Sequence, residues 1–302
     1  MDHLEAGYTS AAQIAERTSV NADALRRLMR HLTRIGILDQ PHEDRYRPTP
    51  LGLHLKAGHP DGVREWLDIE GGVGRADLCF VELLHSIRTG EPSFPVQFGT
   101  AYWADLTDDP HRCKSFDELM ARRMTLAADA IADAYDWPSL NSVVDIGGGD
   151  GTLVMTLLDR FPGLRGAVFE LPGRTGRADA GDRPSDALAR FQSMQGDFFD
   201  GVPDSFDAYL LSSILHDWDD HHSALILRNC AKAAGRRGRI LIIETLGSGK
   251  PSTESDLRML AYTGGRERNL DEIRSLAQSS GLCVAGVHPA ARRSIIECTP
   301  NG

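Results

Sequence analysis

Three acidic residues stand at the ends of successive apolar runs in the second half of the chain, and this order can build a nucleoside site. Asp145 precedes a loop of three consecutive glycines that begins at Gly147 and ends at Gly149. Glu170 ends the next apolar run, and Asp197 ends the one after it. Carboxylates at the ends of neighbouring parallel strands meet at one edge of a sheet, where they can accept hydrogen bonds from ribose hydroxyls and from an adenine amino group.

The glycine loop discriminates between two adenosine cofactors. A dinucleotide fingerprint reads G-x-G-x-x-G, but Thr152 occupies the position of the third glycine. The loop also carries Asp145 and Asp150, and carboxylates repel a pyrophosphate while they attract a cation. This pattern favours S-adenosylmethionine (SAM), which carries a sulfonium, over NAD. Phe198 follows Asp197 directly and can stack on the adenine ring.

Strands and helices alternate from residue 140 onward. The expected strands are 143–146, 167–170, 191–195, 206–211 and 239–243, with helices after the first strand and around 224–234. Residues 282–288 and 292–298 are expected to pair as a final hairpin across His288 and Pro289. The alternation predicts an α/β fold with a doubly wound, mostly parallel, Rossmann-like sheet. Such a sheet binds ligands at the carboxyl ends of its strands.

The N-terminal segment has the pattern of a winged helix. Ser10 and Asn21 can cap two short helices within residues 10–34, and Gly36 can stop the second. Short strands at 37–38 and 46–47 are expected to follow. Winged helices often bind DNA, but residues 1–60 hold eight basic and seven acidic side chains, a weak footprint for nucleic acid. We therefore favour a dimerisation module.

Residues 61–135 are expected to be largely helical, with a break at 89–95 and a long helix over 116–135. Phe94 and Trp103 belong to a group of aromatic residues after the break, and two interpretations stay open. They can pack helices together, or they can line a pocket for a flat substrate. Methionines such as Met120 on the long helix are more often core residues than ligand contacts.

Length and composition limit the class of protein. At roughly 150 residues per domain, 302 residues suggest two domains. No apolar run approaches the roughly 20 residues of a membrane span, and the N-terminus lacks the apolar region of a signal peptide. The net charge of −10 disfavours nucleic acid and anionic membranes as partners. Five widely spaced cysteines indicate free thiols and a cytoplasmic protein.

Five motifs give the chain a specific resemblance. They are VVDIGGGDG (143–151), FELP (169–172), GDFF (196–199), LHDW (215–218) and GGRER (264–268). In this order they resemble SAM-dependent O-methyltransferases of the plant phenylpropanoid and bacterial aromatic-polyketide kind, including enzymes that methylate anthracyclines. The resemblance implies a class I methyltransferase sheet and a homodimer. The domains would be 1–60 for dimerisation, 61–135 as a helical connector with the substrate pocket, and 136–302 for SAM binding and catalysis.

The resemblance also implies roles for individual residues. His216 is the general base, and Glu244 and Glu267 are the carboxylates beside it. A phenol has a pKa of about 10 and a free histidine about 6.5, so complete proton transfer before attack would cost about 5 kcal/mol. The carboxylates would reduce this cost by making the imidazole more basic. Two alternatives stay open: Glu267 can pair with Arg266 or Arg268, and the polar run from His216 to 222 can hold a metal, although no metal is expected.

Further residues follow from the resemblance. Ser212 and Trp218 are expected to line the cofactor, and Met120 to lie by the substrate. Asn269 replaces a common threonine after the last motif, and both residues can cap a helix. Relatives have some tens of residues before the counterpart of Met1. The chain is therefore expected to lack leading helices that intertwine two subunits, and its dimer to be weaker.

Three functions remain as hypotheses. The favoured one is methyl transfer from SAM to a phenolic hydroxyl of a small aromatic metabolite. A second keeps the fold and bound SAM but performs hydroxylation or decarboxylation, a reaction that does not need a base at His216. A third is a DNA-binding regulator that senses SAM, which the net charge disfavours.

Overall fold

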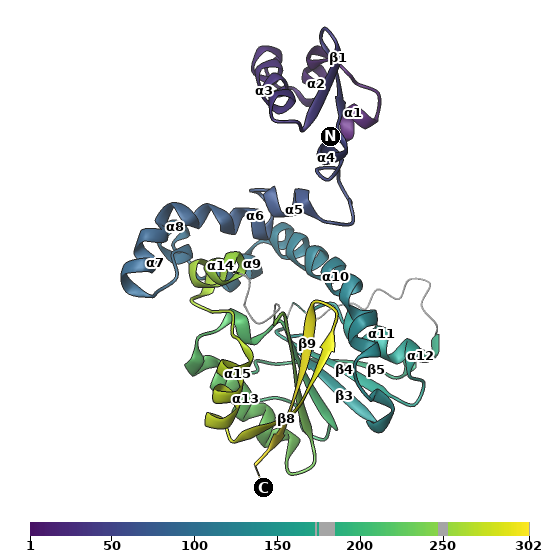
Figure 1. The fold of residues 1–302 in the computed structure, drawn as a ribbon, viewed down its shortest axis with the longest axis vertical. Coiled ribbons are helices and arrows are strands. Elements are labelled where there is room, and N and C mark those ends of the chain that lie inside the picture. Colours follow the sequence, from purple (N-terminus) through teal and green to yellow (C-terminus); the bar gives the residue numbers. More distant parts are fainter. Residues whose placement is uncertain (173, 175–184, 247–252, 302) are drawn as a thin grey trace. The chain divides into compact units, whose positions relative to one another are not determined.

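The structure is a computed structural model that describes residues 1–172, 174, 185–246 and 253–301. The contacts divide the chain into two compact units, Met1–Arg75 and Ala76–Gly302. The colours of Figure 1 follow the residue numbers, so the first unit lies at the purple to blue end of the scale. The first unit therefore extends beyond residue 60, where the sequence suggested a boundary. An ion pair across the expected boundary contributes to the difference, because Arg64 contacts Asp2.

The first unit combines short helices with a two-stranded hairpin. Its elements are α1 (Asp2–Glu5), α2 (Ala11–Thr18), α3 (Ala22–Arg34), β1 (Leu38–His42), β2 (Arg45–Pro48), α4 (Pro50–Leu53) and α5 (Val63–Leu67). Ser10 caps α2 and Asn21 caps α3, as the sequence predicted. Gly36 follows α3 with a φ of +81°. The order of helices and hairpin is the expected one, and membership of the winged-helix class stays a prediction.

Helices α6 to α10 follow in the chain and precede the strands of the sheet. They are α6 (Gly72–Asp77), η1 (Leu78–Glu82), α7 (Leu83–Thr89), α8 (Phe94–Phe98), α9 (Tyr102–Asp108) and α10 (Pro110–Asp133), and η2 (Trp137–Ser139) follows. The long helix α10 begins six residues before the expected Phe116. Asp109 explains this start, since its Oδ1 accepts hydrogen bonds from the backbone N–H groups of His111 and Arg112. Pro110 then fits the first turn, where no N–H partner is needed.

A seven-stranded sheet forms the centre of the second unit. Its strands are β3 (Ser142–Ile146), β4 (Arg165–Glu170), β5 (Phe191–Gln195), β6 (Ala208–Ser212), β7 (Arg239–Glu244), β8 (Leu282–Ala290) and β9 (Arg293–Pro300), in the order β5-β4-β3-β6-β7-β9-β8. Strands β3 to β7 pair in parallel, and β9 pairs antiparallel to β7 and β8. The strand order reverses between β3 and β6, so this sheet has its ligand crevice at the carboxyl ends of those two strands.

Two strand boundaries differ from the expectation. β6 begins at Ala208, two residues later than predicted. The last hairpin turns at 291–292, with Ala291 at a φ of +55°, and not across His288 and Pro289. Pro289 continues β8 because this strand lies at the edge of the sheet, where a missing N–H breaks no ladder between inner strands.

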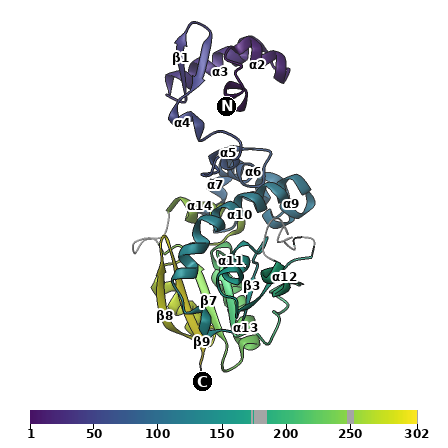
Figure 2. The same cartoon turned by 90° about the vertical axis from the view of Figure 1, so that its right-hand side faces the viewer.

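Helices cover both faces of the sheet (Figures 1 and 2). Side chains from α10 and α11 (Thr152–Arg160) pack on one face, in a cluster that includes Ile131, Leu157 and Leu210. Side chains from α13 (Asp220–Ala234) and α15 (Leu270–Ser279) pack on the other, in a cluster with Ile226 and Tyr209. Two short helices complete the unit, α12 (Ser185–Ala189) and α14 (Thr253–Thr263), together with η3 (Leu215–Asp217). This three-layer arrangement fixes the strand ends that carry the candidate site.

None of the helices in the described ranges combines the length and the apolar character that a membrane span requires.

Candidate active site

The glycine loop after β3 is held tightly at the edge of the sheet. Gly147 and Gly149 have φ values of +69° and +57°, which glycine adopts without strain. The N–H of Gly147 donates to the carbonyl of Phe169 at the end of β4, at 2.8 Å. A Cβ on Gly147 would lie 2.6 Å from Cδ1 of Ile214. The loop therefore needs glycine in order to pass this close to its neighbours.

Asp145 lies beneath this loop as a buried carboxyl group. The residue is only 2% exposed, and its Oδ1 has no hydrogen-bond partner. Burial raises the pKa of Asp145 to about 8, and the carboxylates of Glu170 and Asp150 add to the rise. An unpartnered buried oxygen costs free energy unless a ligand or water satisfies it. A cationic group bound in the crevice would satisfy it and favour the carboxylate form.

Glu170 lies beside the glycine loop, as the order of strand ends predicted. Its Oε2 accepts from the N–H of Gly149 at 3.3 Å, and its Oε1 accepts from the N–H of Leu171 at 2.9 Å. Burial raises the pKa of Glu170. The carboxylate is thus oriented by backbone donors, and each oxygen keeps further lone pairs for ligand hydroxyls.

The GDFF turn and Trp218 form an aromatic group beside these acids. Oδ1 of Asp197 accepts from the N–H of Phe199 at 2.8 Å. The rings of Phe198 and Phe199 meet Trp218 edge-on, with centroids 6.0 and 4.7 Å apart. Asn229 on α13 donates to the carbonyls of both phenylalanines, at 2.8 and 3.0 Å. The sequence analysis missed Asn229, because one asparagine inside a helix carries no local signal.

Ser212 ends β6 and contacts a cation from β9, which lies two strands away in the sheet. Arg293 on β9 donates to Oγ of Ser213 at 2.7 Å and to Oγ of Ser212 at 3.3 Å. Burial lowers the pKa of Arg293, and the carboxylates of Glu244 and Asp145 oppose this change. Arg293 thus supplies positive charge beside the Glu244 and Asp145 carboxylates, and the sequence analysis missed it.

His216 meets two carboxylates from distant segments. Nδ1 lies 3.1 Å from Oε1 of Glu267 and 4.0 Å from Oε2 of Glu244, while Nε2 lies 3.6 Å from Oδ1 of Asp217. The side chains of Glu244 and Glu267 are only 7% and 6% exposed. The three residues expected to act together are therefore neighbours. The Nδ1 contact leaves Nε2 as the nitrogen that can exchange a proton with another molecule.

The charges of this cluster make the imidazole strongly basic. Burial alone lowers the pKa of His216, but Asp217, Glu244 and Glu267 outweigh it and raise the pKa to about 10. Burial alone would raise the pKa of Glu267, but His216 and the hydroxyl of Ser255 hold it below its usual value. The favoured state of the pair is therefore an imidazolium with the Glu267 carboxylate.

The segment 264–268 is packed directly against η3. A Cβ on Gly265 would lie 2.2 Å from the carbonyl oxygen of His216, so only glycine permits this approach. The N–H of Arg266 donates to that same carbonyl at 2.9 Å. Arg268, which is 5% exposed, donates to the carbonyls of Leu215 at 2.6 Å and Trp218 at 2.8 Å. These contacts fix the backbone on both sides of the histidine.

Glu267 is held by α14 and not by the neighbouring arginines. Oε1 accepts from Oγ of Ser255 at 2.5 Å, and the N–H of Glu267 donates to Oδ1 of Asp256 at 2.9 Å. Arg266 pairs with Glu272 at 2.7 Å, and Arg268 pairs with Asp220 at 2.8 Å. The alternative in which Glu267 pairs with Arg266 or Arg268 is therefore wrong, because both arginines pair with other carboxylates.

The polar run from His216 to 222 does not converge on one point. His222 pairs with Asp219 at 2.8 Å as part of the start of α13, whereas His216 turns toward Glu244 and Glu267. Within the ranges that the structure describes, donor atoms close enough for a shared ion occur in His216, Glu244 and Glu267, and in a separate group in the first unit.

The residues expected near the substrate have different surroundings. Phe94 is fully buried and packs against Phe98 and Tyr102. Trp103 is partly buried, with the guanidinium of Arg174 5.4 Å from its ring centroid. Met120 is partly buried on α10. The packing interpretation accounts for Phe94, and substrate contact at all three positions stays a prediction.

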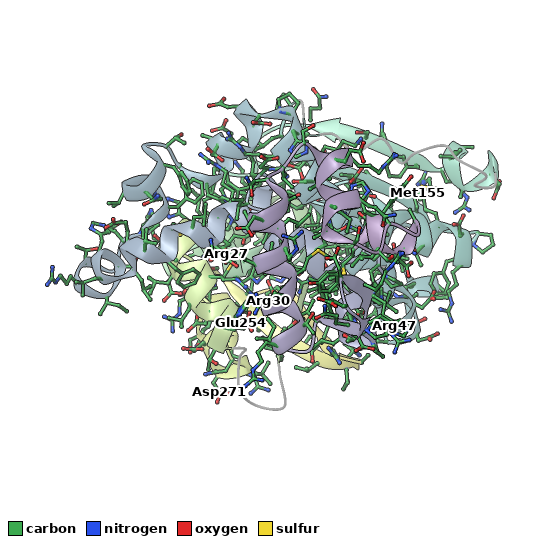
Figure 3. The ribbon with its side chains drawn as sticks, turned by 90° about the horizontal axis from the view of Figure 1, so that it is seen from above. Arg27, Arg30, Arg47, Met155, Glu254 and Asp271 are labelled. Carbon is green, nitrogen blue, oxygen red and sulfur yellow. The ribbon has the colours of Figure 1, made fainter. Side chains whose placement is uncertain are left out.

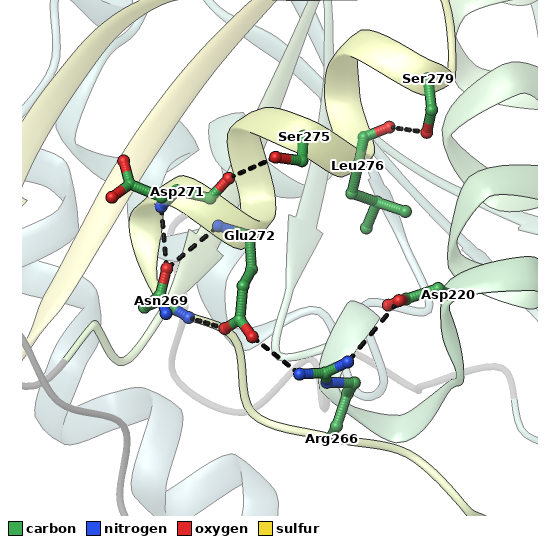
Figure 4. A pocket seen from close by; sticks show the side chains of 8 residues that line it. All are labelled: Asp220, Arg266, Asn269, Asp271, Glu272, Ser275, Leu276 and Ser279. Atoms are coloured by element: carbon green, nitrogen blue, oxygen red, sulfur yellow. Dashed lines mark hydrogen bonds and ion pairs between the residues drawn. The ribbon is translucent and has the colours of Figure 1, made fainter.

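A surface pocket of about 450 Å³ lies beside α15, next to the end of the segment 264–268 (Figure 4). Arg266 bridges Asp220 and Glu272 there, and Asn269 caps α15 together with Glu272, as expected for this position. The side chains around the pocket are thus engaged with one another. They anchor the segment that carries Glu267, while His216 and the glycine loop lie outside this lining.

Comparisons with known proteins agree with this geometry. Residues 80–283 match the O-methyltransferase domain family, and residues 1–56 match the O-methyltransferase dimerisation domain. The chain is 44% identical to a 2,7-dihydroxy-5-methyl-1-naphthoate 7-O-methyltransferase of Streptomyces carzinostaticus, over 99% of this chain and 90% of the relative. It is 41% identical to the aclacinomycin 10-hydroxylase RdmB of Streptomyces purpurascens, over 94% of this chain and 78% of that relative.

A solved structure has nearly the same fold. The O-methyltransferase NcsB1 from neocarzinostatin biosynthesis, in complex with SAM and 2-hydroxy-5-methyl naphthoic acid, superposes with a TM-score of 0.93 at 44% identity. The match covers 99% of this chain and 91% of that one. The dimerisation domain makes the homodimer the expected assembly. With both domains matched and the strand-end acids in place, this chain belongs to the SAM-dependent O-methyltransferases of aromatic secondary metabolism.

Proposed function

We propose that this enzyme methylates a phenolic hydroxyl of a fused-ring aromatic acid, with His216 as the general base. The observation that carries the proposal is the contact of Nδ1 of His216 with Glu267. This contact directs Nε2 away from the Glu267 carboxylate. A relative of known structure is in complex with a hydroxynaphthoic acid, which is a compound of this class. Cytoplasmic location belongs to the same proposal, and the five free cysteines support it.

The residues at the strand ends fit SAM chemically. Asp145 has a buried oxygen without a partner, Glu170 has acceptor capacity for ribose hydroxyls, and Trp218 offers a ring for adenine. The glycine loop permits close backbone approach, because there is no room for a Cβ atom at Gly147. SAM supplies an electrophilic methyl group for in-line displacement. The protein supplies alignment of the acceptor oxygen and removal of its proton.

Proton removal depends on the basicity of His216. At a pKa of about 10, the imidazole matches an ordinary phenol, so the transfer itself costs little free energy. An uncoupled histidine would leave a cost of about 5 kcal/mol for the same step. The cluster therefore lowers the cost of proton transfer from the phenol but adds the cost of deprotonating His216, which carries its own proton at neutral pH. We infer that activity rises as the pH approaches the pKa of this group.

Glu244 and Glu267 have different parts in this proposal. Glu267 accepts a hydrogen bond from the N–H at Nδ1 and fixes the orientation of the ring, since it is the carboxylate at hydrogen-bond distance. Glu244 lies 4.0 Å from Nδ1, so it acts through its charge. Its Oε1 is buried without a hydrogen-bond partner. Loss of Glu267 should therefore disturb the orientation of the base more than loss of Glu244.

The decisive experiment is a product assay. The protein is incubated with methyl-labelled SAM and a panel of hydroxynaphthoic acids, and products are analysed by mass spectrometry. Transfer of the label to an ether oxygen is expected. Products that gain oxygen or lose carbon dioxide without label would favour the second function, for which the 41% identity with RdmB is the supporting observation.

The regulator hypothesis is tested by a gel shift at several salt concentrations. Arg27 and Arg30 are exposed on α3 (Figure 3), which is the feature that could favour DNA. Arg47 and Arg26, in contrast, form ion pairs with Asp39 and Asp44. Binding that falls steeply with salt and depends on Arg27 and Arg30 would revive the hypothesis.

A further inference from the structure

A group of two histidines and one aspartate in the first unit lies outside the catalytic site. Nδ1 of His54 is 2.6 Å from Oδ2 of Asp61, and Nδ1 of His59 is 3.8 Å from the same oxygen. The two imidazole rings have centroids 4.6 Å apart and are tilted by 53°. One donor atom from each of the three residues lies within 4.8 Å of the other two.

These distances lie on either side of the spacing of ligands around a tetrahedral metal ion. With metal–ligand bonds of roughly 2.0–2.1 Å, two ligand atoms are about 3.3 Å apart. The two separations from Asp61, 2.6 and 3.8 Å, lie on either side of that value. Two imidazoles with one carboxylate form a donor set that zinc accepts, and a water molecule can take the fourth position.

The backbone brings the three side chains together without strain. Gly58 and Gly62 bracket His59 and Asp61, with φ values of +69° and +61°. The N–H of His59 donates to the carbonyl of Lys56, and the N–H of Gly62 donates to the carbonyl of His59. The chain therefore folds back over the eight residues from His54 to Asp61 in a hydrogen-bonded turn.

Asp2 anchors both sides of this turn. Its Oδ1 accepts from the N–H of Ala57 at 3.0 Å, and its other oxygen pairs with Arg64 in the first turn of α5. The side chains of His54, His59 and Asp61 are 41%, 26% and 53% exposed. A hydrated ion can therefore reach the group, and the anchored backbone limits the rearrangement that coordination requires.

We propose that His54, His59 and Asp61 bind a zinc ion in the first unit, independently of methyl transfer. Coordination uses one nitrogen of each neutral imidazole and one carboxylate oxygen, so binding releases any proton held by the imidazoles. The ion would cross-link the turn between α4 and α5 and stabilise the unit that carries the dimerisation domain. It performs no chemical step and leaves His216 unaffected.

The test uses the full-length enzyme, stripped of metal with a chelator and titrated with Co²⁺ and then Zn²⁺. We expect one equivalent of Co²⁺ to give the visible absorption of a four-coordinate complex, and Zn²⁺ to displace it. His59→Gln and His54→Gln should weaken binding by more than the roughly 10–100-fold effect typical of residues that only support a ligand. His42→Gln, an exposed histidine at the end of β1, is the matched control and should bind normally.

The second group of donors, His216 with Glu244 and Glu267, requires its own variant. If His216→Gln abolishes the absorption while His59→Gln retains it, the ion binds in the catalytic site and the proposal is wrong. Equal binding by the parent and the His54/His59 double variant would also overturn it. Asp61→Asn keeps the shape of the side chain and removes its charge, so it gives an independent check if a histidine variant folds poorly. Methyl transfer should be unchanged in all first-unit variants, whatever the acceptor.

Discussion

Glu267 contacts His216 at 3.1 Å although 51 residues separate them in the chain. The contact exists because Gly265 and Arg266 lie against the carbonyl of His216, and because Ser255 and Asp256 hold Glu267 from the other side. His216 and Glu267 are thus parts of one packed cluster, built from η3, α14 and the segment between α14 and α15. Several consequences of this arrangement are measurable.

Replacing His216 with alanine should lower kcat by about 10²–10⁴-fold, the usual contribution of a general base. SAM affinity should change little, since Glu170 and the glycine loop are untouched. His42→Ala is the control, because His42 is an exposed histidine at the end of β1 in the first unit. The variant should recover activity on a ring-fluorinated phenol of lower pKa. Parental kcat of His216→Ala on an ordinary phenol would end the base assignment.

The pH dependence of stability should report the same group. The pKa of His216 is raised from 6.5 to about 10, so its stabilising effect is complete below pH 6.5 and disappears as the pH rises through 10. The free energy of unfolding of the parent, measured in urea, should fall by about 2–5 kcal/mol more than that of His216→Gln between pH 7 and 10.5. His42→Gln should follow the parent. Equal losses in parent and His216→Gln would mean that the raised pKa is not real.

Activity should depend on pH with the opposite sign. The general base must be neutral, so kcat/KM should rise by about tenfold per pH unit between pH 6 and 8 and level off near the pKa of His216. Glu267→Gln removes one of the charges that raise this pKa. Its profile should therefore level off at lower pH, which a purely structural role for Glu267 would not produce.

Gly265→Ala should damage catalysis through the backbone. The added Cβ would meet the carbonyl oxygen of His216 at 2.2 Å, so the segment or η3 must move. Overpacking of this kind costs about 1–3 kcal/mol in stability. We expect a lower kcat with little change in SAM affinity. Gly163→Ala is the control, since nothing lies within 4 Å of its added Cβ. Parental activity in Gly265→Ala would contradict the positioning role.

Glu170→Ala should weaken the binding of SAM and S-adenosylhomocysteine by about 1.5–3 kcal/mol, the range for hydrogen bonds to a charged group. Calorimetry measures this directly, and NAD should not bind to the parent. Asp200→Ala is a suitable control because Asp200 is exposed after the GDFF turn. If Asp200→Ala weakens binding as much as Glu170→Ala, the loss reflects overall charge and not a specific contact.

The sequence alone determined the features that depend on a few neighbouring residues. Caps at Ser10, Asn21 and Asn269 act on N–H groups two or three residues ahead, so their type and position were enough. Alternation of apolar runs with helical patterns likewise predicted the doubly wound sheet and the order of its strand-end acids. The motifs then identified the family before any contact was known.

The tertiary structure decided what depends on distant segments. Local patterns placed the start of α10 and the last hairpin turn incorrectly, because Asp109 and the edge position of β8 override the apolar period. The sequence left open whether Glu267 pairs with His216 or with an adjacent arginine. The packing of α14 beside Glu267 decides for His216. Arg268, Asn229 and the His54–His59–Asp61 group act through contacts that have no local signature. Packing between elements, which no short window of sequence contains, selects those contacts.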